Sequence, residues 1–233
     1  MTNSLPIIGI VGGTGALGSA LGFRWARAGY PVILGSRDAQ KAQARAHQLT
    51  AGVGQLDLTG ASNADAVARA ACVVVTVPWS AQESALSAIR AYVGDKIVVV
   101  TTVPLVPPKV ARVQLPPEGS AAVRAQNLLG AEARVVAGFH NVAAHKLAQA
   151  GDVDCDVLVF GDDKQAREQV IALAEAAGLR GLHGGPLVNS AAAEALTSVL
   201  IFLNKTYGID GAGIRITGAP GEAMPARLQS YAP

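Results

Sequence analysis

The sequence predicts an α/β fold, with a doubly wound, mostly parallel sheet followed by a small C-terminal α/β domain. Short apolar runs alternate with helix-like segments along most of the 233 residues. A glycine-rich turn follows the first apolar run, and the alternation restarts after residue 150. Such alternation is typical of parallel sheets with right-handed crossovers. We therefore expect one domain over residues 1–150 and a smaller one over 151–233.

Composition excludes several classes of protein. Half of the residues are apolar, 15% are charged and the net charge is +2, which is unlike a disordered chain. So small a charge does not indicate binding to nucleic acid or to an anionic membrane. The apolar runs are shorter than the roughly 18 residues of a membrane span. Cys72 and Cys155 have no nearby histidines, which predicts reduced thiols in a cytoplasmic protein and no metal site.

The first 71 residues predict three strand–helix pairs. Apolar runs mark the strands, and helical spacing of small and apolar residues marks the segments between them. Asp38 is suited to cap the second helix, because its carboxylate can accept hydrogen bonds from free backbone N–H groups. The expected elements are strands 7–11, 30–36 and within 54–60, and helices 15–29, 38–50 and 63–71.

The rest of the chain repeats this pattern around a long loop. Runs 72–78 and 96–102 are continuously apolar, as expected for strands covered on both faces. A Pro-rich loop over 104–120 is too long to be a simple connection. The other expected elements are helix 80–92, a helix near 120–130, strands 134–140 and 154–161, helix 164–177, a short strand near 181–185 and helix 189–206.

The first turn carries a dinucleotide-binding motif of the Rossmann type. Gly13, Gly15 and Gly18 follow the pattern G-x-G-x-x-G between a strand and a helix. We expect Gly13 to permit the tight turn, Gly15 to let the backbone approach a pyrophosphate, and Gly18 to let the helix pack closely. The N-terminus of that helix offers free N–H groups to phosphate.

The end of the second strand predicts which dinucleotide binds. Enzymes that use NAD usually carry an acidic residue there, which accepts hydrogen bonds from the ribose 2′-OH. This chain has Ser36 and Arg37, with Lys41 one helical turn further on. A hydroxyl, a guanidinium and an ammonium suit a 2′-phosphate, which a carboxylate would repel. The predicted cofactor is therefore NADP, and we expect Arg45 to be a solvated surface residue.

The loops after the later strands should form the rest of the site. Segments 76–79, 101–108 and 138–145 are apolar and carry no Ser-His-Asp set, no Ser/Tyr/Lys triad and no clear carboxylate pair. Ketone reduction needs a proton donor, whereas hydride transfer between two ring carbons needs two flat rings held together in a dry site. His140 could position such a ring, or it could be part of the scaffold.

At this point the sequence resembles the F420-dependent NADP oxidoreductases over about 200 of its 233 residues. The matching segments occur in the family's order; they are GGTGALG, GSRDAQK, TVPW, PLVPPKVARVQLPPEGSAA, GFHNVAAHKL, VFGDD and GPLVNSAAAEALTSVLIFLNKTYG. The resemblance implies reversible hydride transfer between NADP(H) and the deazaflavin coenzyme F420. It also implies a deazaflavin pocket between the two domains and a homodimer, with small-molecule partners only.

The resemblance also assigns roles to individual residues. It implies a pyrophosphate site at Thr14, Gly15, Ala16 and Leu17, a 2′-phosphate site at Ser36, Arg37 and Lys41, an NADP channel at Pro78, Trp79, Glu83, Val106 and Ala144 with Ala212 nearby, and deazaflavin contacts at His140 and Val142. Two features depart from the family. Ala143 stands where some members have proline, and the segment 218–233 extends past their usual end.

Two other functions remain open. The chain could be an NADPH-dependent reductase of a flavin or of a small carbonyl or imine substrate, because a flavin is also a flat tricyclic ring. It could instead be an NADP-sensing protein without catalysis. The apolar loops beside the nicotinamide position argue against a sensor, which does not need room for a second ring.

Overall fold

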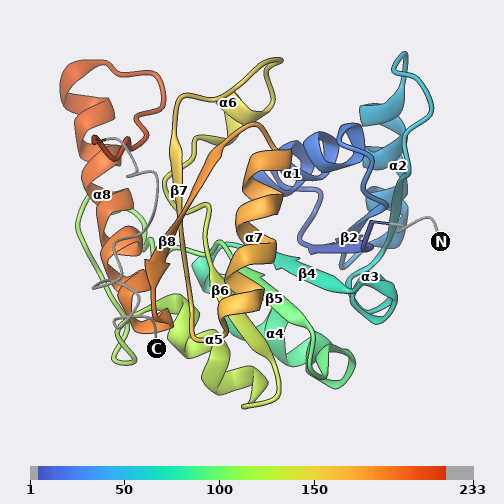
Figure 1. Ribbon diagram of the computed structural model, residues 1–233, viewed down its shortest axis with the longest axis horizontal. Coiled ribbons are helices and arrows are strands. Elements are labelled where there is room, and N and C mark those ends of the chain that lie inside the picture. The colour runs from blue at the N-terminus through green and yellow to red at the C-terminus, as the bar shows by residue number, and fades with distance from the viewer. Residues whose placement is uncertain (1–4, 219–233) are drawn as a thin grey trace.

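The structure is a computed structural model that describes residues 5–218, so most of the segment predicted to extend past the family's end lies outside the described residues. The described strands form one eight-stranded sheet in the order β3-β2-β1-β4-β5-β6-β7-β8 (Figure 1). The strands are β1 (Ile8–Val11), β2 (Val32–Ser36), β3 (Leu58–Ser62), β4 (Cys72–Val75), β5 (Ile97–Val100), β6 (Arg134–Ala137), β7 (Asp156–Gly161) and β8 (Arg180–Gly185).

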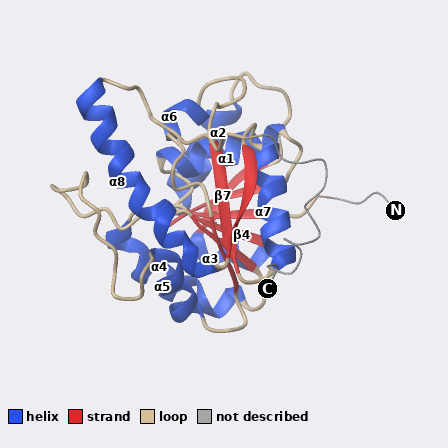
Figure 2. Ribbon diagram, turned by 60° about the vertical axis from the view of Figure 1, so that its left-hand side comes forward, coloured by secondary structure: helices blue, strands red, loops and turns tan. Residues whose placement is uncertain are grey.

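Helices cover both faces of this sheet (Figure 2). They are α1 (Ala16–Arg27), α2 (Ala39–Thr50), α3 (Asn63–Arg69), α4 (Trp79–Val93), α5 (Ala121–Leu129), α6 (Ala144–Leu147), α7 (Lys164–Ala176), the 3₁₀ turn η1 (Leu187–Asn189) and α8 (Ser190–Tyr207). The predicted α/β fold with a doubly wound, mostly parallel sheet is confirmed.

The direction of the strands reverses once across the sheet, between β6 and β7. From β3 to β6 all neighbouring strands are parallel, β7 is antiparallel to β6, and β8 is parallel to β7. The C-terminal strands therefore extend the first sheet and do not form a second one. The boundary at residue 150 stays a prediction.

Several boundaries differ from those expected. The third strand is shifted to Leu58–Ser62, and the strands expected to reach residues 78, 102 and 140 end at Val75, Val100 and Ala137. Helix α6 was not expected. The strand ends differ because the three runs continue as loops that line the site, where Thr101, Thr102, Phe139 and His140 are buried and Pro78 is exposed.

The core lies on both faces of the central strands. All residues of β1, β4 and β5 are buried. On one face Ile10, Val74 and Val99 pack with α1 and α7, and on the other Val73 and Val98 pack with α3, α4 and α5. Burial of each such side chain contributes about 1.5–3 kcal/mol to the free energy of unfolding.

Helix α1 joins the two halves of the chain. Trp25 is fully buried, meets the ring of Phe139 edge-on at 5.9 Å and donates a hydrogen bond from Nε1 to the Leu173 carbonyl on α7 at 2.7 Å. Arg24 donates hydrogen bonds to four backbone carbonyls that follow α6 and α7; they belong to Leu147, Gln149, Gly151 and Ala177. Both side chains therefore fix the C-terminal elements against α1.

One described helical stretch, Leu187–Tyr207, is long and apolar enough to cross a membrane by length and composition alone, with a mean hydropathy of 1.4. The apolar runs of the sequence did not indicate this stretch. In this fold a third of its apolar window is buried. Its Glu194 carboxylate accepts hydrogen bonds from the first two backbone N–H groups of α5, Ala121 and Ala122, at 2.6 and 3.1 Å. The helix is thus attached to α5 by a buried polar contact.

Candidate functional site

The glycine-rich turn lies between β1 and the N-terminus of α1. A Cβ on Gly18 would lie 2.9 Å from the Gly13 Cα, and one on Gly13 would lie 3.0 Å from the Leu34 Cα, so both positions require glycine. The left-handed residue is Gly12, with φ of 76°. Gly13, to which the sequence assigned the tight turn, lies within this turn directly after Gly12.

The turn presents its backbone to solvent. Thr14, Gly15 and Ala16 are exposed, and Gly15 is the N-cap of α1 without a side-chain partner for the free N–H groups. Those N–H groups and the positive end of the helix dipole can bind a phosphate. Leu17 is turned away from this surface and lines a neighbouring cavity.

Two side chains from distant elements hold the turn. Asn63 on α3 accepts a hydrogen bond through Oδ1 from the Gly12 N–H at 3.2 Å. Arg45 on α2 donates from Nε to the Ser19 hydroxyl at 3.0 Å, and this hydroxyl lies 2.7 Å from the Gly15 carbonyl. Arg45 was expected to be a solvated surface residue. That was wrong, because its guanidinium binds the Ser19 hydroxyl, which in turn contacts the Gly15 carbonyl of the turn.

The first cavity of the site, of about 470 Å³, connects this turn to the end of β2. Gly12, Thr14 and Gly15 line one side, and Ser36 and Arg37 line another. The Asp38 carboxylate is not part of the lining of this cavity; it accepts hydrogen bonds from the Gln40 and Lys41 N–H groups and caps α2. The structure thus brings Thr14 and Gly15 of the predicted pyrophosphate site into one cavity with Ser36 and Arg37 of the predicted 2′-phosphate site.

The second cavity of the site, of about 520 Å³, adjoins the first and shares Thr76, Val77 and Pro78 with it. Its walls carry no acidic, lysine or arginine side chain among the described residues, and the polar groups there are hydroxyls and His140. The complete lining is Leu17, Thr76, Val77, Pro78, Trp79, Ser80, Thr101, Thr102, Val103, Leu105, Pro107, Val110, Phe139, His140, Val142 and Thr197. A long ligand could therefore extend from the glycine turn into a largely apolar chamber.

His140 is the central polar residue of the second cavity. The preceding Phe139 has a φ of 64°, a left-handed conformation that is uncommon for an aromatic residue. The His140 side chain is 7% exposed, and neither ring nitrogen has a hydrogen-bond partner within the protein. Burial lowers the pKa of the imidazole to about 4, so it is neutral at pH 7. An unpartnered buried nitrogen that lines a cavity is suited to a polar atom of a ligand.

Thr197 on α8 is a site residue that the sequence did not indicate. It lines the second cavity, and its hydroxyl donates to the His140 carbonyl at 3.1 Å. The two residues are 57 positions apart and belong to no local motif. Spacing alone therefore gave no signal for this contact.

Trp79 and Glu83 lie one helical turn apart near the start of α4. Trp79 lines the second cavity, and the Arg124 guanidinium lies over its ring, 5.0 Å from the centroid. Glu83 forms an ion pair with Arg124. Glu83 thus orients the Arg124 guanidinium over the Trp79 ring. Glu83 itself does not line either cavity.

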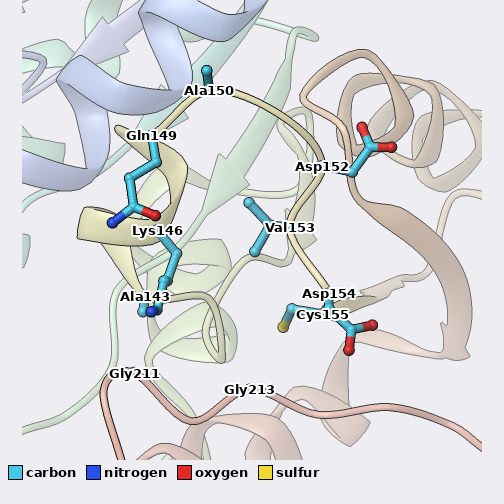
Figure 3. A pocket seen from close by; sticks show the side chains of 10 residues that line it. All are labelled: Ala143, Lys146, Gln149, Ala150, Asp152, Val153, Asp154, Cys155, Gly211 and Gly213. Atoms are coloured by element: carbon cyan, nitrogen blue, oxygen red, sulfur yellow. The ribbon is translucent and has the colours of Figure 1, made fainter.

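The remaining predicted residues lie outside both cavity walls. Lys41 follows Arg37 closely in the sequence, but its side chain is 77% exposed and does not line the first cavity. Val106 is exposed on the long loop, and Ala144 begins α6. Ala212 is bound through its N–H to the Asn204 side chain at 2.8 Å. Its neighbours Gly211 and Gly213 line a separate cavity of about 260 Å³ beside Cys155 (Figure 3).

Two of the charged side chains around that separate cavity are already paired with other residues. Figure 3 shows Lys146, Asp152 and Asp154 around its rim, but Lys146 is bound to Asp210 at 2.6 Å and Asp154 to Arg215. Among residues 5–218, no group of three or more His, Cys, Asp or Glu side chains could hold a metal ion. The chemistry of the site therefore depends on the two connected cavities.

Comparison with known proteins identifies relatives along nearly the whole chain. A family model described as "NADP oxidoreductase coenzyme F420-dependent" matches residues 7–104. The F420-dependent NADP reductase of Methanothermobacter thermautotrophicus is 42% identical, over 91% of this chain and 95% of that protein. The protein of the same name from Methanocaldococcus jannaschii is 37% identical, over 90% of this chain and 97% of its own length.

Solved structures agree on the fold. A crystal structure from Arthrobacter sp. FB24, assigned there to the F420-dependent NADP reductases, superposes with a TM-score of 0.74 at 25% identity, covering 91% of this chain and 99% of that chain. An imine reductase from Bacillus cereus superposes with a TM-score of 0.62 at 19% identity, covering 87% of this chain and 62% of that chain. The second likeness concerns the fold alone.

Arg37→Ala tests the 2′-phosphate assignment. We expect the affinity for NADPH to fall about 10- to 100-fold, because one charge-assisted contact is lost, while the weak affinity for NADH changes little. Titration calorimetry with both nucleotides measures this. Arg69→Ala, which removes an exposed arginine on α3, is the matched control. Equal affinity of the unmodified protein for NADPH and NADH would contradict the assignment.

The buried imidazole of His140 should make stability depend on pH. Its pKa is lowered by burial from 6.5 to about 4, so between these values the unfolded chain binds a proton that the folded chain does not. This contribution is complete above pH 6.5 and is lost as the pH falls to 4, by about 3 kcal/mol. Urea unfolding of the protein and of His140→Gln at pH 7 and pH 4 isolates it. The same loss in both proteins would show that His140 does not titrate as a buried group.

Proposed function

Because the chain belongs to the F420-dependent NADP oxidoreductase family, we propose that it transfers a hydride reversibly between NADP(H) and the deazaflavin coenzyme F420. The chain covers at least 95% of the length of these two relatives, so the similarity includes all parts of them that could take part in the reaction. Both reactants carry a hydride on a ring carbon, and this supplies the chemistry. The protein's part is to bind the two rings together and to exclude water.

The paired cavities support this function. The first offers the backbone of Thr14, Gly15 and Ala16 to a pyrophosphate, and Ser36 and Arg37 to a 2′-phosphate. The neighbouring chamber would then receive the nicotinamide and, facing it, the deazaflavin. His140 and Val142 line this chamber, and a turn of the imidazole would bring one of its buried, unpartnered nitrogens to a polar edge of such a ring.

The single observation that carries the proposal is that the walls of the second cavity, as formed by residues 5–218, hold no general acid. Reduction of a carbonyl requires a proton for the developing alkoxide. His140 cannot supply it near neutral pH, because its pKa is about 4, and the other polar side chains there are hydroxyls of serine and threonine. Hydride transfer to C5 of the deazaflavin requires a dry, close approach at about 3–3.5 Å, and the accompanying proton goes to a remote ring nitrogen that solvent can reach.

Direct transfer of deuterium tests the proposed reaction. With stereospecifically deuterated NADPH and oxidised coenzyme F420, we expect the label at C5 of the deazaflavin without loss to water, and the reverse reaction should occur. Mass spectrometry and proton NMR of the product measure this. The same assay with free flavin and with a cyclic imine is the comparison. Fast turnover with either, and none with the deazaflavin, would contradict the proposal.

We also propose that the enzyme is a cytoplasmic homodimer that associates through α8. Both cysteines are buried thiols, which suits a reducing compartment. Val199 and Phe202 are three residues apart on one face of α8, and 55% of the Phe202 side chain is exposed, as is 71% of Tyr207 near the end of the helix. Exposed apolar patches of this kind mark sites of association.

A charge on this face should separate the protomers. We expect sedimentation velocity to give a dimer for the unmodified protein and a monomer for Phe202→Glu, because an unpaired carboxylate would be buried at the interface. Tyr92→Glu places the same charge at another exposed aromatic residue, on α4, and should remain dimeric. A monomeric unmodified protein, or a dimeric Phe202→Glu, would contradict this assignment.

A further inference from the structure

Asn141 follows His140 directly, but its side chain points to a different part of the fold. The residue is buried, and it is not among the residues that line the second cavity. Its Nδ2 group donates two hydrogen bonds to α8, one to the Ala193 carbonyl at 3.0 Å and one to the Thr197 hydroxyl at 3.1 Å. Both protons of the amide are therefore used in fixing the loop after β6 to α8.

The contact with Thr197 determines what that hydroxyl can do. The Thr197 oxygen accepts from Asn141, and its own proton lies within reach of the His140 carbonyl at 3.1 Å and the Ala193 carbonyl at 3.2 Å. The two carbonyls compete for the one hydroxyl proton, and the shorter contact is the one to the His140 carbonyl. A chain of hydrogen bonds thus runs from the Asn141 amide through Thr197 to the backbone of His140.

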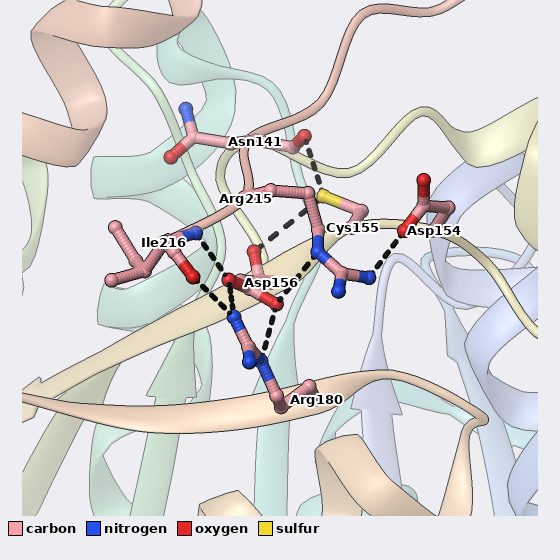
Figure 4. A network of polar contacts seen from close by, with 7 residues as sticks. All are labelled: Asn141, Asp154, Cys155, Asp156, Arg180, Arg215 and Ile216. Atoms are coloured by element: carbon pink, nitrogen blue, oxygen red, sulfur yellow. Dashed lines mark hydrogen bonds and ion pairs between the residues drawn. The ribbon is translucent and has the colours of Figure 1, made fainter. Parts of the chain in front are cut away.

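The same loop is held from its other side. The Asn141 carbonyl accepts a hydrogen bond from the Cys155 thiol, with a sulfur-to-oxygen distance of 3.4 Å (Figure 4). Cys155 is followed by Asp156, whose carboxylate binds Arg180 and the Ile216 N–H. The thiol proton can also reach the Asp156 carbonyl at 3.5 Å, so residue 141 contacts the start of β7 weakly and is held mainly by α8.

The loop needs such support because of its conformation. Phe139 is left-handed, and a bulky residue keeps that conformation only when its surroundings hold it. The His140 imidazole makes no hydrogen bond to the protein that could fix its direction. Its position in the cavity must therefore come from the packing of Phe139 and from the backbone contacts on either side of it.

We propose that Asn141 is a positioning residue for the deazaflavin site: through the Thr197 hydroxyl it fixes the His140 backbone, so that the imidazole meets the ring of coenzyme F420 at the distance that hydride transfer requires. This inference depends on the proposed function for the identity of the ring. We expect Asn141 to affect the deazaflavin more than NADPH, because the groups offered to the NADPH phosphates lie in the first cavity, whereas the second cavity receives both rings.

Asn141→Ala should separate the two substrates. We expect kcat/KM for coenzyme F420 to fall about 10-fold, in line with the loss of two neutral hydrogen bonds, while KM for NADPH stays within about twofold. Fluorescence titration with oxidised coenzyme F420 alone should show a matching loss of affinity without turnover. Asn189→Ala is the control, because it removes another amide that donates to a backbone carbonyl, that of Gly184, away from both cavities.

Thr197 variants test the chain of contacts itself. Thr197→Val keeps the shape without the hydroxyl and should reproduce Asn141→Ala, while Thr197→Ser should behave like the unmodified enzyme. The double variant Asn141→Ala/Thr197→Val should be no worse than either single variant, because all three break one chain. Additive losses would overturn the proposal, and so would an Asn141→Ala enzyme with unchanged kcat/KM for coenzyme F420.

A readout without ligand keeps this test separate from the proposed reaction. Long-range ¹H–¹⁵N spectra of the free protein should show the His140 imidazole in one environment, and in several exchanging environments in Asn141→Ala, with equal unfolding midpoints at pH 7. An unchanged His140 signal would overturn the positioning role. If the unmodified enzyme reduced no coenzyme F420 but the His140 signal changed as expected, the proposed function would fail and the positioning of His140 would stand.

Discussion

The close packing of α1 against the sheet is the constraint on which the rest of the structure depends. At its N-terminal end, Gly18 lets the helix approach the glycine turn so closely that a Cβ there would lie 2.9 Å from the Gly13 Cα. In its second half, Trp25 meets Phe139 edge-on and binds the backbone of α7. One helix therefore sets the phosphate site and also supports the left-handed turn that leads into His140. A shift of α1 would disturb both ends of the cleft.

Charge is distributed unevenly between the two connected cavities of the site. The phosphate end has exposed backbone N–H groups, Arg37 and a carboxylate, Asp38, that is occupied as a helix cap. The ring end has no charged side chain on its walls among the described residues, and its histidine is neutral because it is buried. This distribution suits an anionic dinucleotide whose phosphates bind at one end and whose nicotinamide enters the chamber of low polarity.

Local patterns in the sequence predicted the strands, most helices, the glycine motif and the Ser36–Arg37 pair, because each depends on neighbouring residues. Contacts between distant residues were missed. Asn63 binds Gly12 across 51 positions, and Thr197 binds His140 across 57, so no spacing rule joins them. Arg45 was misjudged for the same reason, since a helix surface pattern does not reveal that Ser19 lies within its reach. The extension of one sheet by β7 and β8 likewise depends on pairing that sequence patterns do not encode.

The central claim is that two flat rings lie face to face beside His140. A crystal structure of the enzyme with NADP⁺ and oxidised coenzyme F420 tests it most directly, because this pair cannot react. The account predicts that nicotinamide C4 and deazaflavin C5 lie about 3–3.5 Å apart in the second cavity, with a His140 nitrogen hydrogen-bonded to the deazaflavin. A deazaflavin bound elsewhere, such as in the cavity beside Cys155, or rings separated by water, would contradict it.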